Sequence, residues 1–334
     1  MRATCLIRRI SRSCAIALCI NAVALPMGTV AHAADYPERP VKIILGFAPG
    51  GATDGLARIL ARMLSERMGQ QFIVDNKPGA ATRIGIEAAQ KASADGYTIG
   101  LATAVTTAFP LMFDGVSFAP DKDFVPISML GRAPTFLMVR KDLPAQNYKE
   151  FVALGKKDGK LTLGHPGNGS NPHIAGLTLA RAEGMPVTSI PYKGTQPAAT
   201  AVGAGEVDFA MMEYAVARPM VEAGKARLLA VTEPRRSAIQ PDIPTGREVG
   251  ITKDVEGLTP WFMMFAPIGT PKPVVDALNK QLREVLATAE VRQQLAQLGV
   301  EPESSSAAEA ASYFNAQRAR VSKLVDELKL SLKN

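Results

Sequence analysis

VKIILGFAPGGATDGLARILARMLSERMG, residues 41–69, decides the fold class of this chain. The run 41–47 is almost wholly apolar, which is typical of a buried strand. From Leu56 to Met68 apolar residues recur at steps of three and four, which predicts an amphipathic helix that Gly69 ends. A glycine turn at Gly50 and Gly51 separates the two segments. Strand, glycine turn and helix in this order predict a parallel α/β unit.

The same alternation continues along the rest of the chain. Further strands are expected at 72–74, 97–102, 124–130, 135–139, 161–163, 187–190, 207–212, 227–231 and 261–266. Further helices are expected at 84–92, 148–156, 172–182, between 194 and 207, at 273–298 with a break near Thr288, and at 307–330. Because the α/β plan repeats, we expect two lobes, and the apolar run 261–266 predicts a strand that returns to the first one. One comprises residues 35–132 plus 259–334, and the other residues 133–258.

The N-terminus has the three parts of a secretory signal peptide. Four arginines and no acidic residue precede an apolar stretch from Cys14 to Val30, and Ala31-His32-Ala33 follows with small residues at the cleavage positions. A membrane anchor is the alternative, but Asn21 and Pro26 interrupt a stretch that falls short of the ~20 apolar residues a span needs. We therefore expect residues 1–33 to be a cleaved signal peptide and the protein to be periplasmic.

Removal of this segment changes what the composition implies. All three cysteines precede residue 34, so disulfides, thiolate metal sites and cysteine nucleophiles are excluded from the mature chain. Without the four signal arginines, 34 basic residues stand against 31 acidic ones, a net charge of +3 in place of +7. That balance gives no electrostatic footprint for nucleic acid. The remaining 301 residues are enough for two hydrophobic cores.

A second glycine-rich turn, residues 164–170, also lies between a predicted strand and a predicted helix. In both turns glycine lets the backbone approach a ligand without a Cβ in the way. The first amides of a helix have no partner within the helix, and they favour a carboxylate or a phosphate. Each turn alone could be only a chain reversal, whereas one in each lobe predicts an anion cradle across a cleft.

The motifs of the common enzyme classes are absent from the sequence. It has no phosphate-binding Gly-Lys-Ser/Thr loop, no dinucleotide fingerprint, no nucleophile elbow and no His-Glu-x-x-His helix. The mature chain has two histidines, His165 and His173, too few for a metal site without partners such as Glu213. Ser170 with His173 could form a hydrolytic pair, but Ser and His at a helix start more often serve as caps. We expect no enzyme activity, no metal and no cofactor.

Several motifs resemble, in order, those of the Bug-type receptors of tripartite tricarboxylate transporters. They are Tyr36-Pro37-x-x-Pro40, Phe47-Ala48-Pro49-Gly50-Gly51-x-Thr53-Asp54, Asn76-x-Pro78-Gly79-Ala80, Asp95-Gly96-Tyr97-Thr98, Gly167-Asn168-Gly169-Ser170-x-Pro172-His173, Pro191-Tyr192-Lys193-Gly194, Ala230-Val231-Thr232 and Gly269-Thr270-Pro271. The resemblance covers nearly the whole mature chain. It implies a two-lobed type II periplasmic-binding fold with mixed sheets, helices on both faces and a ligand cleft between the lobes. It also implies capture of a small organic acid or related solute and its delivery to a two-component membrane permease.

The resemblance also implies a set of ligand-binding residues. The first-lobe set is Phe47, Gly50, Gly51, Thr53 and Asp54, which would hold a carboxylate through backbone amides, with Thr103 and Thr106 as hydroxyl donors. The second-lobe set is Gly167, Asn168, Gly169, Ser170 and His173, with Tyr192, Lys193 and Gly194 at the rim.

Departures from the family pattern bear on the choice of ligand. Glu213-Tyr214 replaces the usual Asp-Asn, and Arg218 adds a positive charge nearby. Arg83 stands where a small polar residue is usual. Glu213, if it faces the cleft, would repel a second carboxylate, which favours a monocarboxylate or an acid that also carries a hydroxyl or an amine.

Other function classes fit the sequence less well. A ligand-sensing regulator would need a DNA-binding segment, whereas a secretion signal occupies the N-terminus. An orphan receptor that acts on a signalling partner in place of a permease remains the alternative. We expect a monomer that binds no nucleic acid.

Overall fold

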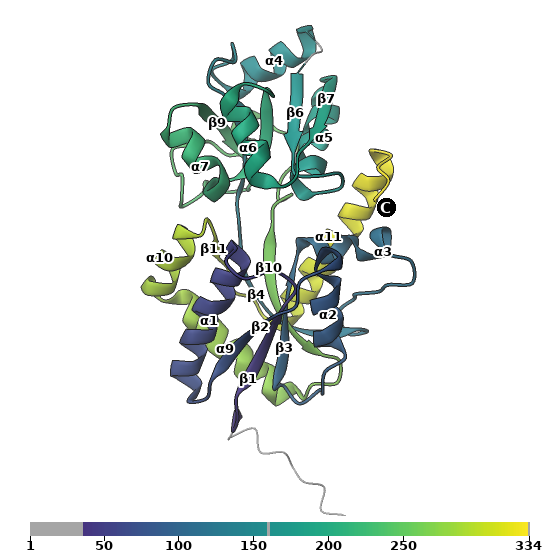
Figure 1. The fold of residues 1–334 in the computed structure, drawn as a ribbon, viewed down its shortest axis with the longest axis vertical. Helices are drawn as coiled ribbons and strands as arrows, with labels where there is room; N and C mark the ends of the chain where they lie inside the picture. Colours follow the sequence, from purple (N-terminus) through teal and green to yellow (C-terminus); the bar gives the residue numbers. More distant parts are fainter. Residues whose placement is uncertain (1–35, 159–160, 333–334) are drawn as a thin grey trace, which may run out of the picture. The chain divides into compact units, whose positions relative to one another are not determined.

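A computed structural model gives the fold for residues 36–158 and 161–332. The predicted signal peptide, residues 1–33, lies outside the described residues. The described chain contains two separate mixed β-sheets with helices packed around them (Figure 1).

The first sheet has the strand order β11-β4-β10-β3-β1-β2. Its strands are β1 (Val41–Leu45), β2 (Phe72–Asn76), β3 (Thr98–Thr103), β4 (Phe124–Arg132), β10 (Trp261–Pro267) and the short β11 (Glu301–Pro302). β1 runs parallel to β2 and β3, whereas β10 runs antiparallel to both β3 and β4. The chain thus enters this sheet twice, and the strand predicted at 261–266 is β10.

Both faces of the first sheet are covered, as alternating side chains of β10 show. Phe262 and Met264 join a hydrophobic cluster with helices α1 (Ala52–Met68), α9 (Lys272–Ala287) and α10 (Ala289–Gln297). Trp261, Met263 and Phe265 join a second cluster with α2 (Arg83–Gln90) and the first half of α11 (Ala307–Glu327). Strand residues point alternately to opposite faces, so a strand buried on both sides is apolar throughout.

The second sheet has the order β7-β6-β8-β5-β9. Its strands are β5 (Thr135–Arg140), β6 (Leu161–His165), β7 (Val187–Pro191), β8 (Phe209–Glu213) and β9 (Ala226–Val231). Helices α4 (Tyr148–Asp158) and α5 (Asn171–Glu183) pack against one face, and α6 (Thr195–Ala204) and α7 (Tyr214–Glu222) against the other. The predicted α/β class, with two lobes and helices on both faces of mixed sheets, is confirmed.

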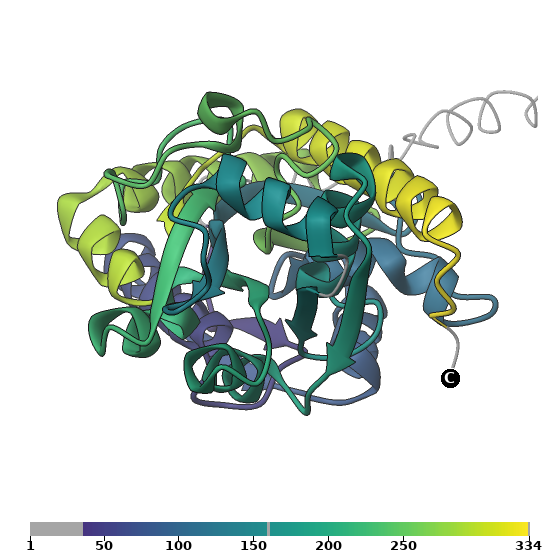
Figure 2. The same ribbon diagram turned by 90° about the horizontal axis from the view of Figure 1, so that it is seen from above.

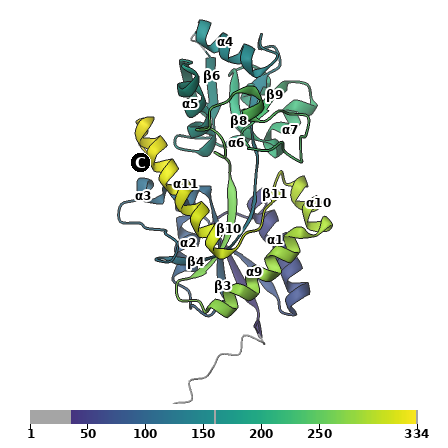
Figure 3. The same cartoon turned by 180° about the vertical axis from the view of Figure 1, so that it is seen from behind.

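Three segments connect the two sheets. The chain passes from β4 to β5 between Arg132 and Thr135, and it returns before β10. The third connection is α11, which starts beside β4 and ends with Val321, Leu324 and Val325 in the cluster of the second sheet. Figure 3 shows α11 running from beside β10 toward α5, and Figure 2 shows the same helix from above, in yellow.

Five short helical elements of the described chain were not among the predicted ones. They are the 3₁₀ turns η2 (Ala80–Thr82) and η3 (Ala104–Ala108), and the helices α3 (Phe109–Met112), α7 and α8 (Gly246–Val249). α3 and α8 are single turns, and α7 contains Pro219, which removes a backbone donor from the helix interior. Among residues 36–158 and 161–332, no helix has the length and apolar character that a membrane crossing requires.

Candidate functional site

A cavity of about 520 Å³ lies between the two lobes, where strands of both sheets end. This volume suits a small ligand. Residues from both lobes and from the connecting segments line it: Phe47, Ala52, Thr53, Thr103, Ala104, Val105, Thr107, Ala108, Met112, Ala133, Pro166, Gly167, Asn168, Gly169, Ser170, Asn171, Ile174, Thr195, Glu213, Ala215, Val216, Pro260, Phe262, Leu298, Val300 and Val321.

The first glycine turn is held from behind by Asp54. Its carboxylate accepts hydrogen bonds from the backbone N–H of Gly50 at 3.0 Å, from Arg58 Nε at 2.9 Å and from Asn76 Nδ2 at 2.9 Å. Asn76 Nδ2 also donates to the carbonyl of Phe47 at 2.9 Å. The Arg58 hydrogen bond, with those from Gly50 and Asn76, lowers the pKa of the buried Asp54 carboxyl to about 2. Asp54 therefore fixes the turn while Phe47, at its start, lines the cavity.

The second glycine turn rests on two stacked histidines. The ring centroids of His165 and His173 are 3.9 Å apart, and both side chains are buried. His173 Nδ1 accepts the backbone N–H of Gly169 at 3.0 Å, and His165 Nδ1 accepts that of Gly167 at 3.3 Å. These bonds need neutral rings with Nδ1 unprotonated. Burial, with a contribution from His165, lowers the pKa of His173 to about 4, so this form persists at neutral pH.

Ser170 caps the helix that follows this turn. Its hydroxyl donates to the carbonyl of Gly167 at 2.7 Å and accepts the backbone N–H of His173 at 3.4 Å. A serine in this position satisfies one of the free amides at a helix start. The sequence interpretation of Ser170 and His173 as a helix-start pair is thus confirmed, and their hydrogen bonds fix the turn.

Four helices begin at the cavity wall. They are α1, α5, α6 and α7, whose first residues are Ala52, Asn171, Thr195 and Tyr214. Three of them, α1, α6 and α7, have no side-chain cap at their N-terminus. Helix N-termini carry partial positive charge from free amides, so together they favour an anion. No lysine, arginine or histidine is among the residues that line this cavity in the described chain.

Glu213 carries the single charged side chain among those lining residues. It ends β8 and occupies the N-cap position of α7, where its side chain makes no capping hydrogen bond. Desolvation raises the pKa of its carboxyl above the ordinary value. Arg218, on the same helix, has its Nε 4.0 Å from Glu222 Oε1.

The structure brings half of the predicted ligand-binding residues to the cavity wall. These are Phe47, Thr53, Thr103, Gly167, Asn168, Gly169, Ser170 and Glu213. The others do not line it: Gly50, Gly51, Asp54, Thr106, His173, Tyr192, Lys193 and Gly194. Contact between any of these residues and a ligand stays a prediction.

The residues off the wall have structural roles of their own. The buried Thr106 hydroxyl donates to the Thr103 carbonyl at 2.7 Å, and Tyr192 OH lies 3.4 Å from a Glu206 oxygen. Lys193 is exposed. Thr106 and Tyr192 therefore take part in local polar contacts next to the cavity wall, whereas Lys193 faces solvent.

Sequence reasoning missed several lining residues next to predicted ones. Thr107 lies beside Thr106, Asn171 beside Ser170 and Thr195 beside Gly194. The neighbouring motif marked the right segment in each case, whereas the orientation of the local turn decided which side chain lines the cavity. Val321 had no such marker, because α11 reaches the cavity from a distant part of the chain.

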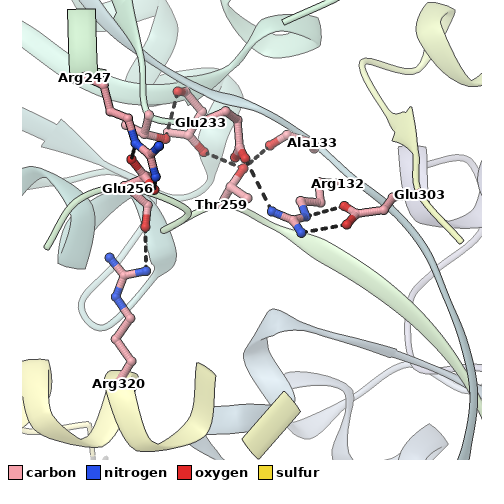
Figure 4. Close-up of polar contacts among 10 residues, drawn as sticks. Arg132, Ala133, Glu233, Arg247, Glu256, Thr259, Glu303 and Arg320 are labelled. Carbon is pink, nitrogen blue, oxygen red and sulfur yellow. Dashed lines mark hydrogen bonds and ion pairs between the residues drawn. The ribbon is translucent and has the colours of Figure 1, made fainter. Parts of the chain in front are cut away.

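The connecting segments carry a polar network next to the cavity (Figure 4). Arg132 forms two contacts with Glu303, at 2.5 and 2.8 Å, and its Nη1 lies 3.6 Å from Glu233 Oε2. The Thr259 hydroxyl donates to the carbonyl of Ala133. Glu233 is buried, and desolvation, partly offset by Arg132, raises the pKa of its carboxyl to about 7.

A second part of this network joins α11 to the segment before Thr259. The guanidinium of Arg320 donates to the carbonyls of Glu256 and Asp254, and the Glu256 carboxylate pairs with Arg247. A side chain of α11 therefore fixes the loop that leads back to β10.

Comparison with known proteins agrees with this geometry. A protein encoded in the tcbD-tcbE intergenic region of Pseudomonas sp. strain P51 is 32% identical over 314 residues, or 92% of this chain and 93% of that protein. The solved structure of the periplasmic binding protein BugD is 33% identical with a TM-score of 0.70, over 90% of this chain and 100% of BugD. An R. palustris protein solved with adipate is 30% identical with a TM-score of 0.75, over 90% of this chain and 100% of that one.

These likenesses confirm the type II periplasmic-binding fold and the Bug-type resemblance of the motifs. Residues 56–330, which include the second glycine turn and begin just after the first, match the family described as the tripartite tricarboxylate transporter family receptor. The chain therefore belongs to this family of periplasmic solute-binding receptors.

Proposed function

We propose that the protein captures a small carboxylate-bearing solute between its two lobes in the periplasm and delivers it to a tripartite tricarboxylate-type membrane permease. The observation that carries the proposal is the wall of the cavity. It combines helix N-termini from opposite lobes, α1 and α5, with the second glycine turn and no basic side chain among the described lining residues.

This arrangement suits an anion that is recognised by fixed backbone dipoles. Helix N-termini and turn amides supply partial positive charge without a flexible side chain to order. Thr53, Thr103 and Ser170 add hydroxyls to the same wall. The relative solved with adipate supports a carboxylate as the ligand class.

The proposed closure of the two lobes around a ligand takes place about the segments that connect them. We assign residues 35–132 plus 259–334 to one lobe and 133–258 to the other, with the second half of α11 packing across to the second lobe. A ligand that contacts both lobes shifts the population toward the closed form, by as much as it binds that form better. The closed form of a monomer is then the state that the permease recognises.

A calorimetric and thermal-shift screen of mono-, di- and tricarboxylates, each with its uncharged amide, tests the proposal. We expect saturable binding of at least one acid, with compaction in small-angle scattering and no response to the fully amidated analogue. Equal binding and compaction with the uncharged amide would overturn the anion cradle. Loss of uptake of that acid in a strain lacking the gene would support the transport role, whereas unchanged uptake with altered gene expression would favour a sensor. N-terminal sequencing of the periplasmic protein tests cleavage after Ala33.

A further inference from the structure

One acidic side chain carries all of the side-chain charge on the described cavity wall. Glu213 is the one charged residue that lines it within the described chain, and it is acidic in a site whose helix ends favour anions. The nearest basic residue along its own helix, Arg218, pairs with Glu222. No described basic side chain on the wall balances the Glu213 carboxylate.

Glu213 and the second glycine turn lie at the ends of two neighbouring strands. The turn follows β6, whereas Glu213 ends β8, and these two strands are parallel neighbours in the second sheet. The carboxyl ends of parallel neighbours lie at one edge of a sheet, about 5 Å apart. One small molecule can therefore contact the turn amides with one end and the Glu213 carboxylate with the other.

The two subsites differ in chemistry. Gly167–Ser170 and the start of α5 favour an anion, while the carboxylate of Glu213 accepts hydrogen bonds and favours a cation. From this juxtaposition, and resting on the proposed function, we infer that Glu213 makes the protein selective for carboxylic acids that also carry an ammonium or amide group, and against dicarboxylates.

The energetic reason lies in the desolvation of Glu213. A half-buried carboxylate that lacks a charged partner gains from a ligand donor, since pairing compensates the lost hydration. A second ligand carboxylate at the same place adds like-charge repulsion at reduced dielectric. Glu213 thus attracts a ligand ammonium or amide group and repels a second ligand carboxylate. We therefore expect affinities for the two ligand classes that differ by at least about tenfold.

Isothermal titration calorimetry with matched acids tests the inference. The probes are 4-aminobutyrate, succinamate, butyrate and succinate, with the corresponding three-, five- and six-carbon sets. The proteins are the wild type, Glu213→Gln, Glu213→Ala and, as a matched control, Glu222→Gln. The control removes a carboxylate from α7 that does not line the cavity.

We expect the wild type to bind the amino or amido acid of at least one chain length at least about tenfold more tightly than the dicarboxylate. Glu213→Gln and Glu213→Ala should reduce or reverse that ratio by about tenfold, and Glu222→Gln should preserve it. Two variants are used because either substitution alone could alter the end of β8. The affinity ratio of the wild type tests the inference without any substitution.

The outcomes separate this inference from the proposed function. A wild-type preference for the dicarboxylate, or a ratio that neither Glu213 variant changes, would overturn the inference and leave the carboxylate receptor intact. If no acid of any set binds, or if uncharged diamides bind equally well, the proposed function fails and the inference fails with it.

Discussion

His173 Nδ1 lies 3.0 Å from the backbone nitrogen of Gly169 and accepts its hydrogen bond. The ring thus acts from beneath the turn, stacked on His165, while Gly169 and Ser170 line the cavity above it. This relationship makes His173 a positioning residue whose effect on ligand binding passes through the backbone.

The first prediction tests the hydrogen bond that His173 accepts separately from the protonation of its ring. His173→Ala should lower the free energy of unfolding by about 1–3 kcal/mol and weaken binding of the best acid from the screen, because the Gly169 amide loses its partner. His173→Asn places an amide oxygen near the position of Nδ1, so it should retain much of the affinity. Urea unfolding and calorimetry at pH 7.5 measure both effects. Equal losses in the two variants would mean that ring packing, not the acceptor, matters.

The pH dependence of stability gives a second measurement on the same residue. The pKa of His173 is lowered in the folded protein to about 4, from 6.5, so its contribution is fully present above pH 6.5 and is lost as the pH falls toward 4. By pH 4 the wild type should lose about 3 kcal/mol more than His173→Asn. Parallel stability curves for the two proteins between pH 7 and 4 would contradict this assignment.

The second prediction concerns Gly50 and Gly51, which the sequence treats alike. Gly50 has φ +95°, a left-handed conformation that favours glycine, whereas Gly51 has φ −83°, and a Cβ on either would meet no atom within 4 Å. Gly50→Ala should therefore cost about 1–2 kcal/mol, and Gly51→Ala should change stability by less than about 0.5 kcal/mol. Chemical denaturation checks the contrast. A larger loss for Gly51→Ala would show that the turn needs glycine at the second position.

Because Gly51 does not need a glycine conformation, Gly51→Val tests where the carboxylate binds without disturbing the fold. The variant should fold with nearly wild-type stability, because its backbone conformation is available to any residue. If it also loses affinity for an acid that the wild type binds, the added side chain blocks approach to the amides of α1. Unchanged affinity would place the carboxylate away from this helix start.

The sequence predicted best where one segment carries its own periodicity. The strand, turn and helix of residues 41–69 correspond to β1, the Gly50–Gly51 turn and α1, and Gly69 ends α1 in the left-handed conformation. The continuous apolar run 261–266 likewise predicted a strand, which is β10 and is buried on both faces. These elements depend on the periodicity of residues within one segment, which can be recognised without the tertiary structure.

The sequence predicted less where distant segments meet. The role of Asp54 in holding the turn depends on Arg58 and Asn76, which reach it from α1 and β2, while its contact with a ligand stays a prediction. The lining residue Val321 depends on α11 crossing from one sheet to the other. Such placements follow from tertiary packing, and no short motif encodes them.

The third prediction concerns Glu233 beside the connecting strands. Its pKa is raised in the folded protein to about 7 by desolvation, so the stability it contributes is present below about pH 4.5 and is lost as the pH rises through 7. Glu233→Gln should be more stable than the wild type at pH 8, by about 3 kcal/mol at most, and nearly equal to it at pH 4. Thermal unfolding across this range measures the difference.

Glu303→Gln is the matched control, since Glu303 also pairs with Arg132 but its side chain is 46% exposed. It should change stability by no more than about 1 kcal/mol. If Glu233→Gln instead destabilises the protein at pH 8, the Arg132–Glu233 ion pair outweighs the desolvation of the carboxylate.

The last prediction concerns the contact between Leu332 and the second glycine turn. A Cβ on Gly169 would lie 2.2 Å from Leu332 Cδ2, and the three heavy atoms nearest to that position all belong to Leu332. The leucine therefore packs directly on the turn. Leu332→Ala should weaken binding of the best acid several-fold, because the loosened turn must be ordered again when the acid binds. Leu330→Ala is the control, since Leu330 packs on the same hydrophobic cluster and is also half-buried.

Both substitutions should cost about 1 kcal/mol of stability, less than a fully buried leucine would, but Leu332→Ala alone should alter affinity. Gly169→Ala completes a double-mutant cycle. It should be strongly destabilising in the wild type, where the new Cβ meets Leu332, and less so beside Leu332→Ala, where the strain of φ +75° at Gly169 remains. Strict additivity of the two changes, with equal effects of Leu330→Ala and Leu332→Ala on affinity, would show that the end of the chain stabilises the second lobe as a whole without acting on the turn.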